Sequence, residues 1–453
     1  MKKVALHNLG CKVNSYEIEV MQEKLSQKGY RVVPFAPGAD IYVINTCTVT
    51  NIADRKSRQM LHKAKKMNPE AVVVAVGCYV QTGTEEVKKD PCIDLAIGNN
   101  RKKDIVSILE DYLEQHQEGT STDKTLGDTT LIDLNAGTHE YEEMTLTHTS
   151  GHTRAYIKIQ DGCNQFCSYC IIPFARGRVR SRKKTDILKE VEGLARAGYR
   201  EIVVTGIHLS SYGVDFEEKD GCKDSLIEVL EALEKVEGIR RIRLGSLEPR
   251  VITEEFAARL KNLKKLCPHF HLSLQSGCNA TLKRMNRRYT TEEFEEKTLL
   301  LRQVFKDPAI TTDVIVGFPG ETEEEFEATK KYLERIRFYD MHVFKFSSRK
   351  GTAAAARTDQ VDEKIKTIRS NQLIQMAKMH SEEYRRRFMG SEIEALIEER
   401  KLIDGEEYQI GFTPSYIKVA VKSDQNLENQ LICGRAAGLA EDYLLIEFSA
   451  CLG

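Results

Sequence analysis

The stretch DGCNQFCSYCIIPFARGRVRSR, residues 161–182, places three cysteines close together and follows them with four arginines. Cys163, Cys167 and Cys170 have the spacing C-x3-C-x2-C, and no second cysteine pair nearby completes a four-ligand zinc site. A [4Fe–4S] cluster that is held by three thiolates has one iron without a protein ligand. The spacing therefore predicts a metal centre with an open position, where a substrate or cofactor binds.

The strand that leads into these cysteines is the first of a series. Six strand-like stretches, separated by amphipathic helices, run from 154 to about 346: AYIKI, EIVVTG, RIRLGS, FHLSLQS, TTDVIVG and HVFKF. This alternation predicts an α/β fold with a parallel sheet. Six β/α units predict a partial (β/α)6 barrel, two units short of the usual eight, and an open doubly wound sheet is the alternative.

The first hundred residues predict a separate Rossmann-like parallel sheet, because strands at 4–9, 41–45 and 71–76 alternate with helices. Each strand runs into a cysteine: NLGC ends at Cys11, INTC at Cys47 and AVGC at Cys78. The carboxyl ends of parallel strands share one edge of a sheet, so the three thiols should converge. The alternative is that they are ordinary buried core cysteines.

Shifts in composition divide the chain into domains. A polar stretch at 115–148 is interpreted as a linker between an N-terminal domain, 1–114, and a core, 149–380. Residues 381–453 alternate apolar and polar positions in IEALIEE, YIKVAVK and YLLIEF. That pattern is typical of a small antiparallel β-barrel of the OB-like kind that binds oligonucleotides, and a dimerisation or capping module is the alternative.

The charge pattern bears on nucleic-acid binding. The net charge of −1 at pH 7 means that any RNA site is a local patch. The four arginines after the cysteines alternate, so an extended segment would place them on one face that suits phosphates, with some pairing instead with acidic neighbours or a cofactor carboxylate. The candidate RNA-binding residues are Arg176, Arg178, Arg180, Arg182 and Lys183.

Two features bear on location. No apolar run reaches the roughly 18 residues that span a bilayer, and the start of the chain lacks a signal-peptide core. We therefore expect a cytoplasmic protein with no membrane partner. In that reducing compartment, the twelve cysteines favour metal or redox chemistry over disulfides.

The spacing C-x3-C-x-(aromatic)-C, with Tyr169 as the aromatic residue, resembles the signature of the radical S-adenosylmethionine (SAM) enzymes. The resemblance implies a [4Fe–4S] cluster whose open iron binds the methionine portion of SAM and whose electron cleaves it to a 5′-deoxyadenosyl radical. It also implies cofactor-binding positions at strand ends within TGIH, SLEP, LQSG and DVIVGFPGE. The candidate cofactor-binding residues are Tyr169, Gly206, Ser246, Glu248, Gln275 and Asp313.

Read together, the N-terminal cysteines, this core and the C-terminal barrel resemble the methylthiotransferase family over essentially the full length. The resemblance implies an auxiliary [4Fe–4S] cluster on Cys11, Cys47 and Cys78 that supplies sulfur, a low-potential electron donor, and a TRAM barrel that binds RNA. GCKVNSYE and GIHLSSYG are similar to the branch that methylthiolates N6-threonylcarbamoyladenosine in tRNA. Isopentenyladenosine tRNA and a ribosomal-protein aspartate are the alternative substrates. A non-catalytic iron–sulfur RNA-binding sensor is the alternative of a different class.

Overall fold

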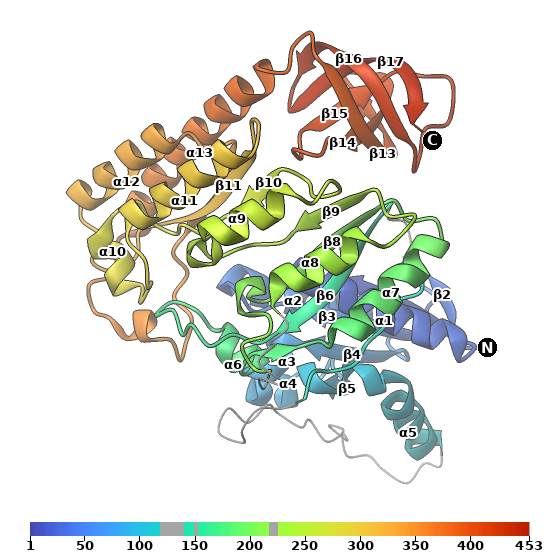
Figure 1. Cartoon of the computed structure of the whole chain (residues 1–453). Coiled ribbons are helices and arrows are strands. Elements are labelled where there is room, and N and C mark those ends of the chain that lie inside the picture. The colour runs from blue at the N-terminus through green and yellow to red at the C-terminus, as the bar shows by residue number, and fades with distance from the viewer. Residues whose placement is uncertain (118–139, 149–152, 217–224, 453) are drawn as a thin grey trace.

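The computed structural model describes residues 1–117, 140–148, 153–216 and 225–452. Three units follow one another in this part of the chain: an N-terminal sheet in blue, a core in green to orange and a C-terminal barrel in red (Figure 1). None of the helices in these ranges combines the length and the apolar character that crossing a membrane requires.

The N-terminal unit is a parallel sheet in the order β2-β1-β3-β4-β5, as the Rossmann-like prediction requires. Its strands are β1 (Lys3–Asn8), β2 (Arg31–Val33), β3 (Ile41–Thr46), β4 (Val72–Gly77) and β5 (Leu95–Ile97). Its helices are α1 (Lys12–Gln27), α2 (Asn51–Met67), α3 (Cys78–Thr82), α4 (Thr84–Lys89) and α5 (Ile105–Gln117). Apolar clusters on both faces bury β3 and β4, which explains why these strands read as unbroken apolar runs.

The core contains the six expected parallel strands. They are β6 (Arg154–Asp161), β8 (Glu201–Gly206), β9 (Arg241–Leu244), β10 (His269–His271), β11 (Ala309–Val316) and β12 (Asp340–Lys345). A short antiparallel strand, β7 (Arg180–Ser181), lies at the edge beside β6. The strands form two hydrogen-bonded sheets, β7-β6-β8-β9 and β10-β11-β12, which parallel bridges at Leu247–Leu272 and Ile242–Leu266 connect. Because β6 to β12 follow one another in chain order, without the reversal of a doubly wound sheet, the partial barrel is confirmed.

Helices cover the outside of this barrel (Figure 1). They are α7 (Lys184–Arg196), α8 (Leu226–Glu234), α9 (Glu254–Lys261), α10 (Asn279–Arg284), α11 (Thr291–Val304), α12 (Glu323–Ile336) and α13 (Glu363–Arg386). The short helix α6 (Ile172–Arg176) instead packs against α3 of the N-terminal unit. Capping boxes start α11 at Thr290 and α12 at Thr322, where each threonine accepts from the backbone of a glutamate that bonds back to it.

The C-terminal unit is a closed barrel in the order β13-β14-β15-β17-β16. Its strands are β13 (Glu392–Ile403), β14 (Glu406–Phe412), β15 (Lys418–Val421), β16 (Leu431–Ala440) and β17 (Tyr443–Leu452). The barrel is antiparallel except where β15 pairs with β17 in parallel. A closed ring with an odd number of strands cannot alternate direction all the way round, so one parallel pair is unavoidable.

Two features lie across the expected domain boundaries. Helix α13 runs through the boundary at 380/381, and the first strand of the C-terminal barrel begins at Glu392. The segment 140–148, placed in the expected linker, packs Met144 and Leu146 into the apolar cluster of the N-terminal sheet. Residues 118–139 of that linker lie outside the described part.

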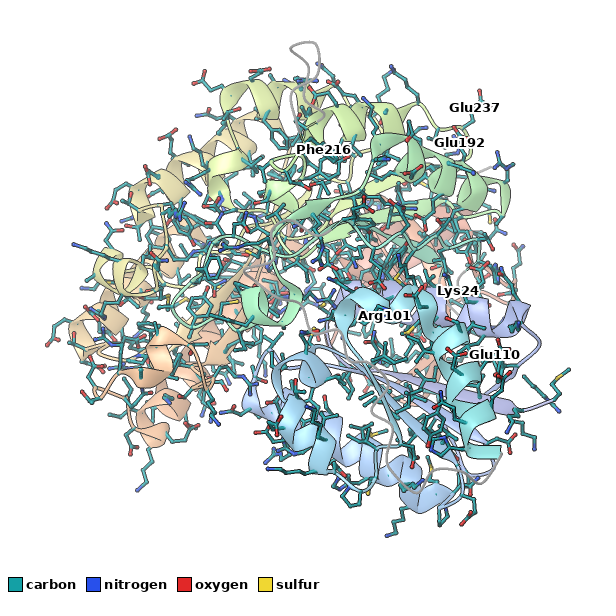
Figure 2. The ribbon with its side chains drawn as sticks, turned by 90° about the horizontal axis from the view of Figure 1, so that it is seen from below. Lys24, Arg101, Glu110, Glu192, Phe216 and Glu237 are labelled. Carbon is teal, nitrogen blue, oxygen red and sulfur yellow. The ribbon has the colours of Figure 1, made fainter. Side chains whose placement is uncertain are left out.

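The C-terminal barrel contacts the amino ends of the core strands. Arg243 of β9 donates to Pro414 O at 2.8 Å, and Arg154 at the start of β6 pairs with Glu398 at 2.5 Å. The N-terminal unit packs through α1 against β6 and β8. Lys24 of α1 and Glu110 of α5 mark this unit in the view from below (Figure 2). The loop that carries Cys163, Cys167 and Cys170 begins at the carboxyl end of β6.

Candidate metal centres

The three N-terminal cysteines converge as expected, because they follow the adjacent strands β1, β3 and β4. Cys11 is the N-cap of α1, and Cys78 is the first residue of α3. The turns before them are left-handed, with φ of 109° at Gly10 and 100° at Gly77. A Cβ on Gly10 would lie only 3.0 Å from Cys47 Sγ, so glycine permits the close approach of these two segments.

The surroundings of this triad favour metal binding over free thiolates. Burial raises the pKa of Cys47 to about 11, and Cys78 and Cys11 act in the same direction. Asn99 Nδ2 donates to Cys78 Sγ at 3.5 Å and to Ala175 O of the core at 2.6 Å. Three crowded thiols are stable as thiolates only beside a compensating cation, which a metal centre provides.

The second triad lies in the loop that follows β6. The backbone turns at Gly162, where φ is 70° and an added Cβ would lie 1.8 Å from Arg178 O. Cys170 N donates to Cys167 O at 2.9 Å, which curls the loop back on itself. Burial raises the pKa of Cys163 to about 11 and that of Cys170 to about 12. These thiols resemble the first triad in chemistry.

Two residues that the sequence did not single out contact the cysteines. Arg287 Nη1 donates to Cys167 Sγ at 3.2 Å, from the segment that follows α10. Asn99 contacts Cys78, as described above. Neither residue belongs to a recognisable local motif, and only the fold brings them to the thiols.

A buried group of charged side chains lies between the N-terminal unit and the core, and we call it the interdomain charge layer. Its members are Glu17, Lys102, Lys158, Asp161, Arg176 and Arg180. Glu17 Oε1 accepts from Arg176 Nη1 and from Lys158 Nζ, each at 2.7 Å, and Glu17 also pairs with Lys102. Burial opposes the charge of Asp161, but Lys158 and Arg176 hold the pKa of this carboxyl well below its ordinary value.

This layer connects the two triads. Arg176 Nη2 donates to Asn14 Oδ1 at 2.6 Å, and Cys11 Sγ lies 3.9 Å from the same oxygen. On the other side, Asp161 precedes Cys163 by two residues. The network is therefore linked to the first triad through the Asn14 side chain and to the second triad through the backbone that follows Asp161.

Known proteins share both halves of this arrangement. The profile of the "Radical SAM superfamily" matches residues 157–333, and that of "Uncharacterized protein family UPF0004" matches residues 3–98. Threonylcarbamoyladenosine tRNA methylthiotransferase MtaB of Bacillus subtilis (strain 168) is 39% identical, over 95% of this chain and 93% of the relative. The chain belongs to the radical SAM tRNA methylthiotransferase family.

Further relatives of this methylthiotransferase carry two different names. The MtaB protein of Aquifex aeolicus is 40% identical, over 88% of this chain and 94% of the relative. A tRNA-2-methylthio-N(6)-dimethylallyladenosine synthase of Thermodesulfovibrio yellowstonii is 35% identical, over 93% of each. Among solved structures, the radical S-adenosylmethionine methyltransferase TsrM of Kitasatospora setae aligns with a TM-score of 0.55 at 16% identity, over 78% of this chain and 74% of that one, and supports the fold.

Methylthiotransferases of this family use SAM and two [4Fe–4S] clusters. The donor sets fit that requirement, because soft thiolates are the ligands of iron–sulfur clusters and the chain groups them in two separate threes. The first three follows the carboxyl ends of β1, β3 and β4, and the second follows that of β6. Glycines with positive φ precede Cys11, Cys78 and Cys163.

The arginine run of this methylthiotransferase differs from the expectation. Only β7 is extended, and Arg176 belongs to α6. Arg176, Arg180 and Arg182 are buried. Arg176 bonds to Glu17 of the N-terminal unit, whereas Arg182 pairs with Glu190 of the core. These three arginines therefore do not form an outer phosphate-binding face. Arg178 and Lys183 are exposed, and Arg178 lies 4.6 Å over the Phe166 ring.

The candidate cofactor-binding residues lie around the carboxyl edge of the barrel, with one exception. Gly206 ends β8, Glu248 is buried and accepts from Arg250 Nε at 2.8 Å, and Gln275 has φ of 72°. Tyr169 packs beside Met285 and Phe318, and Ser246 is exposed. Asp313 instead lies within β11, with His271 Nε2 3.2 Å from its carboxylate. The expected strand-end position is wrong for Asp313, because β11 continues to Val316.

Proposed function

We propose that this enzyme adds a methylthio group to C2 of N6-threonylcarbamoyladenosine beside the anticodon of tRNA. The observation that carries the proposal is the presence of two thiol triads linked to one buried charge layer, one through Asn14 and the other through the backbone at Asp161. An aromatic C–H bond offers no acidic proton for general acid–base work, so the reaction needs cofactors of this kind. The 39–40% identity to relatives named for threonylcarbamoyladenosine supports the substrate.

We assign one cluster to each triad. Cys163, Cys167 and Cys170 would hold the cluster that binds SAM, and Cys11, Cys47 and Cys78 would hold the auxiliary cluster. When bound, these groups supply reductive cleavage of SAM and the sulfur that is inserted. In this assignment the chain contributes Arg287 beside one triad, Asn99 beside the other, and the charge layer that fixes their relative position.

Two surfaces would contact the tRNA. Phe174 is exposed and meets Phe166 edge to face with ring centroids 6.1 Å apart, while Arg178 lies over Phe166. An exposed aromatic ring next to a half-buried ring and a guanidinium suits unstacked RNA bases. The C-terminal TRAM barrel would bind a second part of the tRNA. An enzyme that acts on tRNA in this way would work in the cytoplasm. A low-potential electron donor would be its partner.

The test is anaerobic incubation of the reconstituted enzyme with SAM, a reductant and tRNA, followed by mass spectrometry of the nucleosides. We expect a methylthio group on threonylcarbamoyladenosine. A product on dimethylallyladenosine alone would favour the second branch, which the 35% relative represents. Modification of a ribosomal-protein aspartate would exclude both tRNA branches. Failure to form 5′-deoxyadenosine would contradict the proposed enzyme activity and favour the alternative of a non-catalytic iron–sulfur RNA-binding sensor.

A further inference from the structure

Arg180 is the one member of the interdomain charge layer whose guanidinium is left without hydrogen bonds. Its side chain is 2% exposed, yet none of its three nitrogens has a hydrogen-bond partner in the described part of the chain. The nearest charge is Asp161 Oδ2, at 3.5 Å from Arg180 Nη2. A guanidinium stays charged and carries five donors, so burying it unbonded is costly unless a ligand completes the site.

The neighbouring arginines, Arg176 and Arg182, have the hydrogen-bond partners that a structural role requires. Arg176 bonds to Glu17, Asp161 and Asn14, and Arg182 pairs with Glu190 and donates to Thr145 Oγ1 at 3.2 Å. Asp161 is already shared, since Lys158 Nζ lies 2.6 Å and Arg176 Nη1 3.2 Å from it. Of the three cations around Asp161, Arg180 therefore lies farthest from the carboxylate and makes the weakest ion pair with it.

The charge balance of the layer favours binding of an anionic ligand. Lys102, Lys158, Arg176 and Arg180 face the carboxylates of Glu17 and Asp161. Glu142 is a third buried carboxyl near Lys158 and Lys102, and burial raises its pKa to about 7, which opposes its charge. Four cations therefore face two charged carboxylates, and a bound anion would balance the remaining positive charge. The N-terminal thiols account for part of it, because Arg176 shares Asn14 with Cys11. Arg180 has no comparable link to a cysteine among the contacts of the described residues.

Arg180 also lies close to the loop that carries the second triad. It pairs directly across from Asp161, two residues before Cys163, and cross-strand partners point to the same side of a sheet. That side faces the layer that reaches the N-terminal triad. In the proposed function the base reacts at both metal centres, so its N6 substituent would lie near the layer that is linked to both triads.

We propose that Arg180 binds the carboxylate of the threonylcarbamoyl group and thereby selects this substrate. The inference rests on the proposed function. A guanidinium and a carboxylate form a bidentate, charge-assisted pair. A dimethylallyl group has no hydrogen-bond acceptor for the five N–H donors of the arginine. A site built to bond a polar group rejects the analogue that lacks it, because its own buried donors then stay unpaired.

The decisive comparison uses the full-length, reconstituted enzyme and its Arg180→Gln variant with three tRNAs. One carries threonylcarbamoyladenosine, one the same nucleoside with its carboxylate esterified, and one unmodified adenosine. We expect wild-type kcat/KM to fall about 10- to 100-fold from the first tRNA to the ester, and the variant to treat the two alike. Arg196→Gln, the same substitution at an exposed position of α7, should keep the wild-type preference.

A second measurement needs no turnover. Before substrate binds, Arg180 makes no hydrogen bond and only a long ion pair to a carboxylate that two other cations hold. Arg180→Gln should therefore leave the Tm of the substrate-free enzyme unchanged or raise it. A residue with a purely structural role would lower the Tm on substitution. The absorbance of the clusters, measured on the same samples, reports whether both metal centres are intact.

Three results would overturn the inference. The Arg180→Gln variant could discriminate against the ester as strongly as the wild type. It could lose SAM affinity with unchanged preference among the tRNAs, in which case the carboxylate is that of SAM. Its Tm could fall by several degrees, which would make Arg180 a structural residue. If the wild-type enzyme itself does not modify threonylcarbamoyladenosine tRNA, the proposed function fails instead.

Discussion

The guanidinium of Arg176 joins the two halves of the catalytic unit: its Nη1 atom lies 2.7 Å from Glu17 Oε1, across the boundary between the core and the N-terminal sheet. Both side chains are fully buried. We therefore expect Arg176→Met to destabilise the protein by about 3–5 kcal/mol, because Glu17 and Asp161 would each lose a buried partner. The measurement is thermal unfolding, with Arg196→Met as the exposed control. Equal Tm values for both variants would contradict this role.

Substitutions in the two triads should affect different steps of the reaction. Cys78→Ala is expected to lose about half of the bound iron, and it should still form 5′-deoxyadenosine while losing sulfur insertion. Cys167→Ala should lose both reactions, because the cluster that binds SAM would lack a ligand. Iron analysis, 5′-deoxyadenosine formation and nucleoside mass spectrometry check this. Normal methylthiolation by the Cys78 variant would refute the auxiliary assignment.

The loop of the second triad depends on one glycine. Gly162→Ala would place a Cβ 1.8 Å from Arg178 O at a φ of 70°, so the loop must move and the second cluster should fail to assemble. Gly198→Ala is the matched control, because its φ is 95° but no atom lies within 4 Å of the added Cβ. We expect that control to cost only about 1–2 kcal/mol of left-handed strain. Iron content and the absorbance of the reconstituted variants are the readouts.

Arg287 should tune one cluster only. Replacing Arg287 by glutamine removes a cation and the donor that lies 3.2 Å from Cys167 Sγ. Hydrogen bonds and positive charge at the sulfurs favour the reduced cluster, so its reduction potential should become more negative. A redox titration followed by electron paramagnetic resonance tests this. A shift of the auxiliary cluster by the same amount would point to a general structural effect.

Glu19 makes stability depend on pH. Burial raises the pKa of this carboxyl to about 8, well above its ordinary value near 4.5. Between these two pKa values the folded protein keeps a proton on Glu19 that the unfolded chain has released. The contribution of this proton to the free energy of unfolding is therefore complete below pH 4.5 and is lost as the pH rises to about 8. Glu19→Gln should therefore gain stability relative to wild type with rising pH, by at most about 1.4 kcal/mol per pH unit. Parallel stability curves from pH 5 to 8 would argue against it.

The sequence by itself determined the parts that short spacing encodes. Cys163, Cys167 and Cys170 lie in one loop, so their grouping follows from the chain alone. The convergence of Cys11, Cys47 and Cys78 followed from strand order, because the ends of parallel strands must meet at one edge. The apolar periodicity was likewise sufficient for the six strands of the core.

Only the tertiary structure decided which side of each segment another domain covers. The alternation of the arginines predicted an outer phosphate-binding face, but a local pattern cannot tell solvent from a segment that packs against the same residues. Helix α1 of the N-terminal unit pairs Arg176 with Glu17, which is distant in the sequence, and Arg180 and Arg182 are buried as well. Contacts between residues far apart in the chain, such as Arg287 with Cys167, depend on how the domains and loops assemble, and that assembly leaves no local signature.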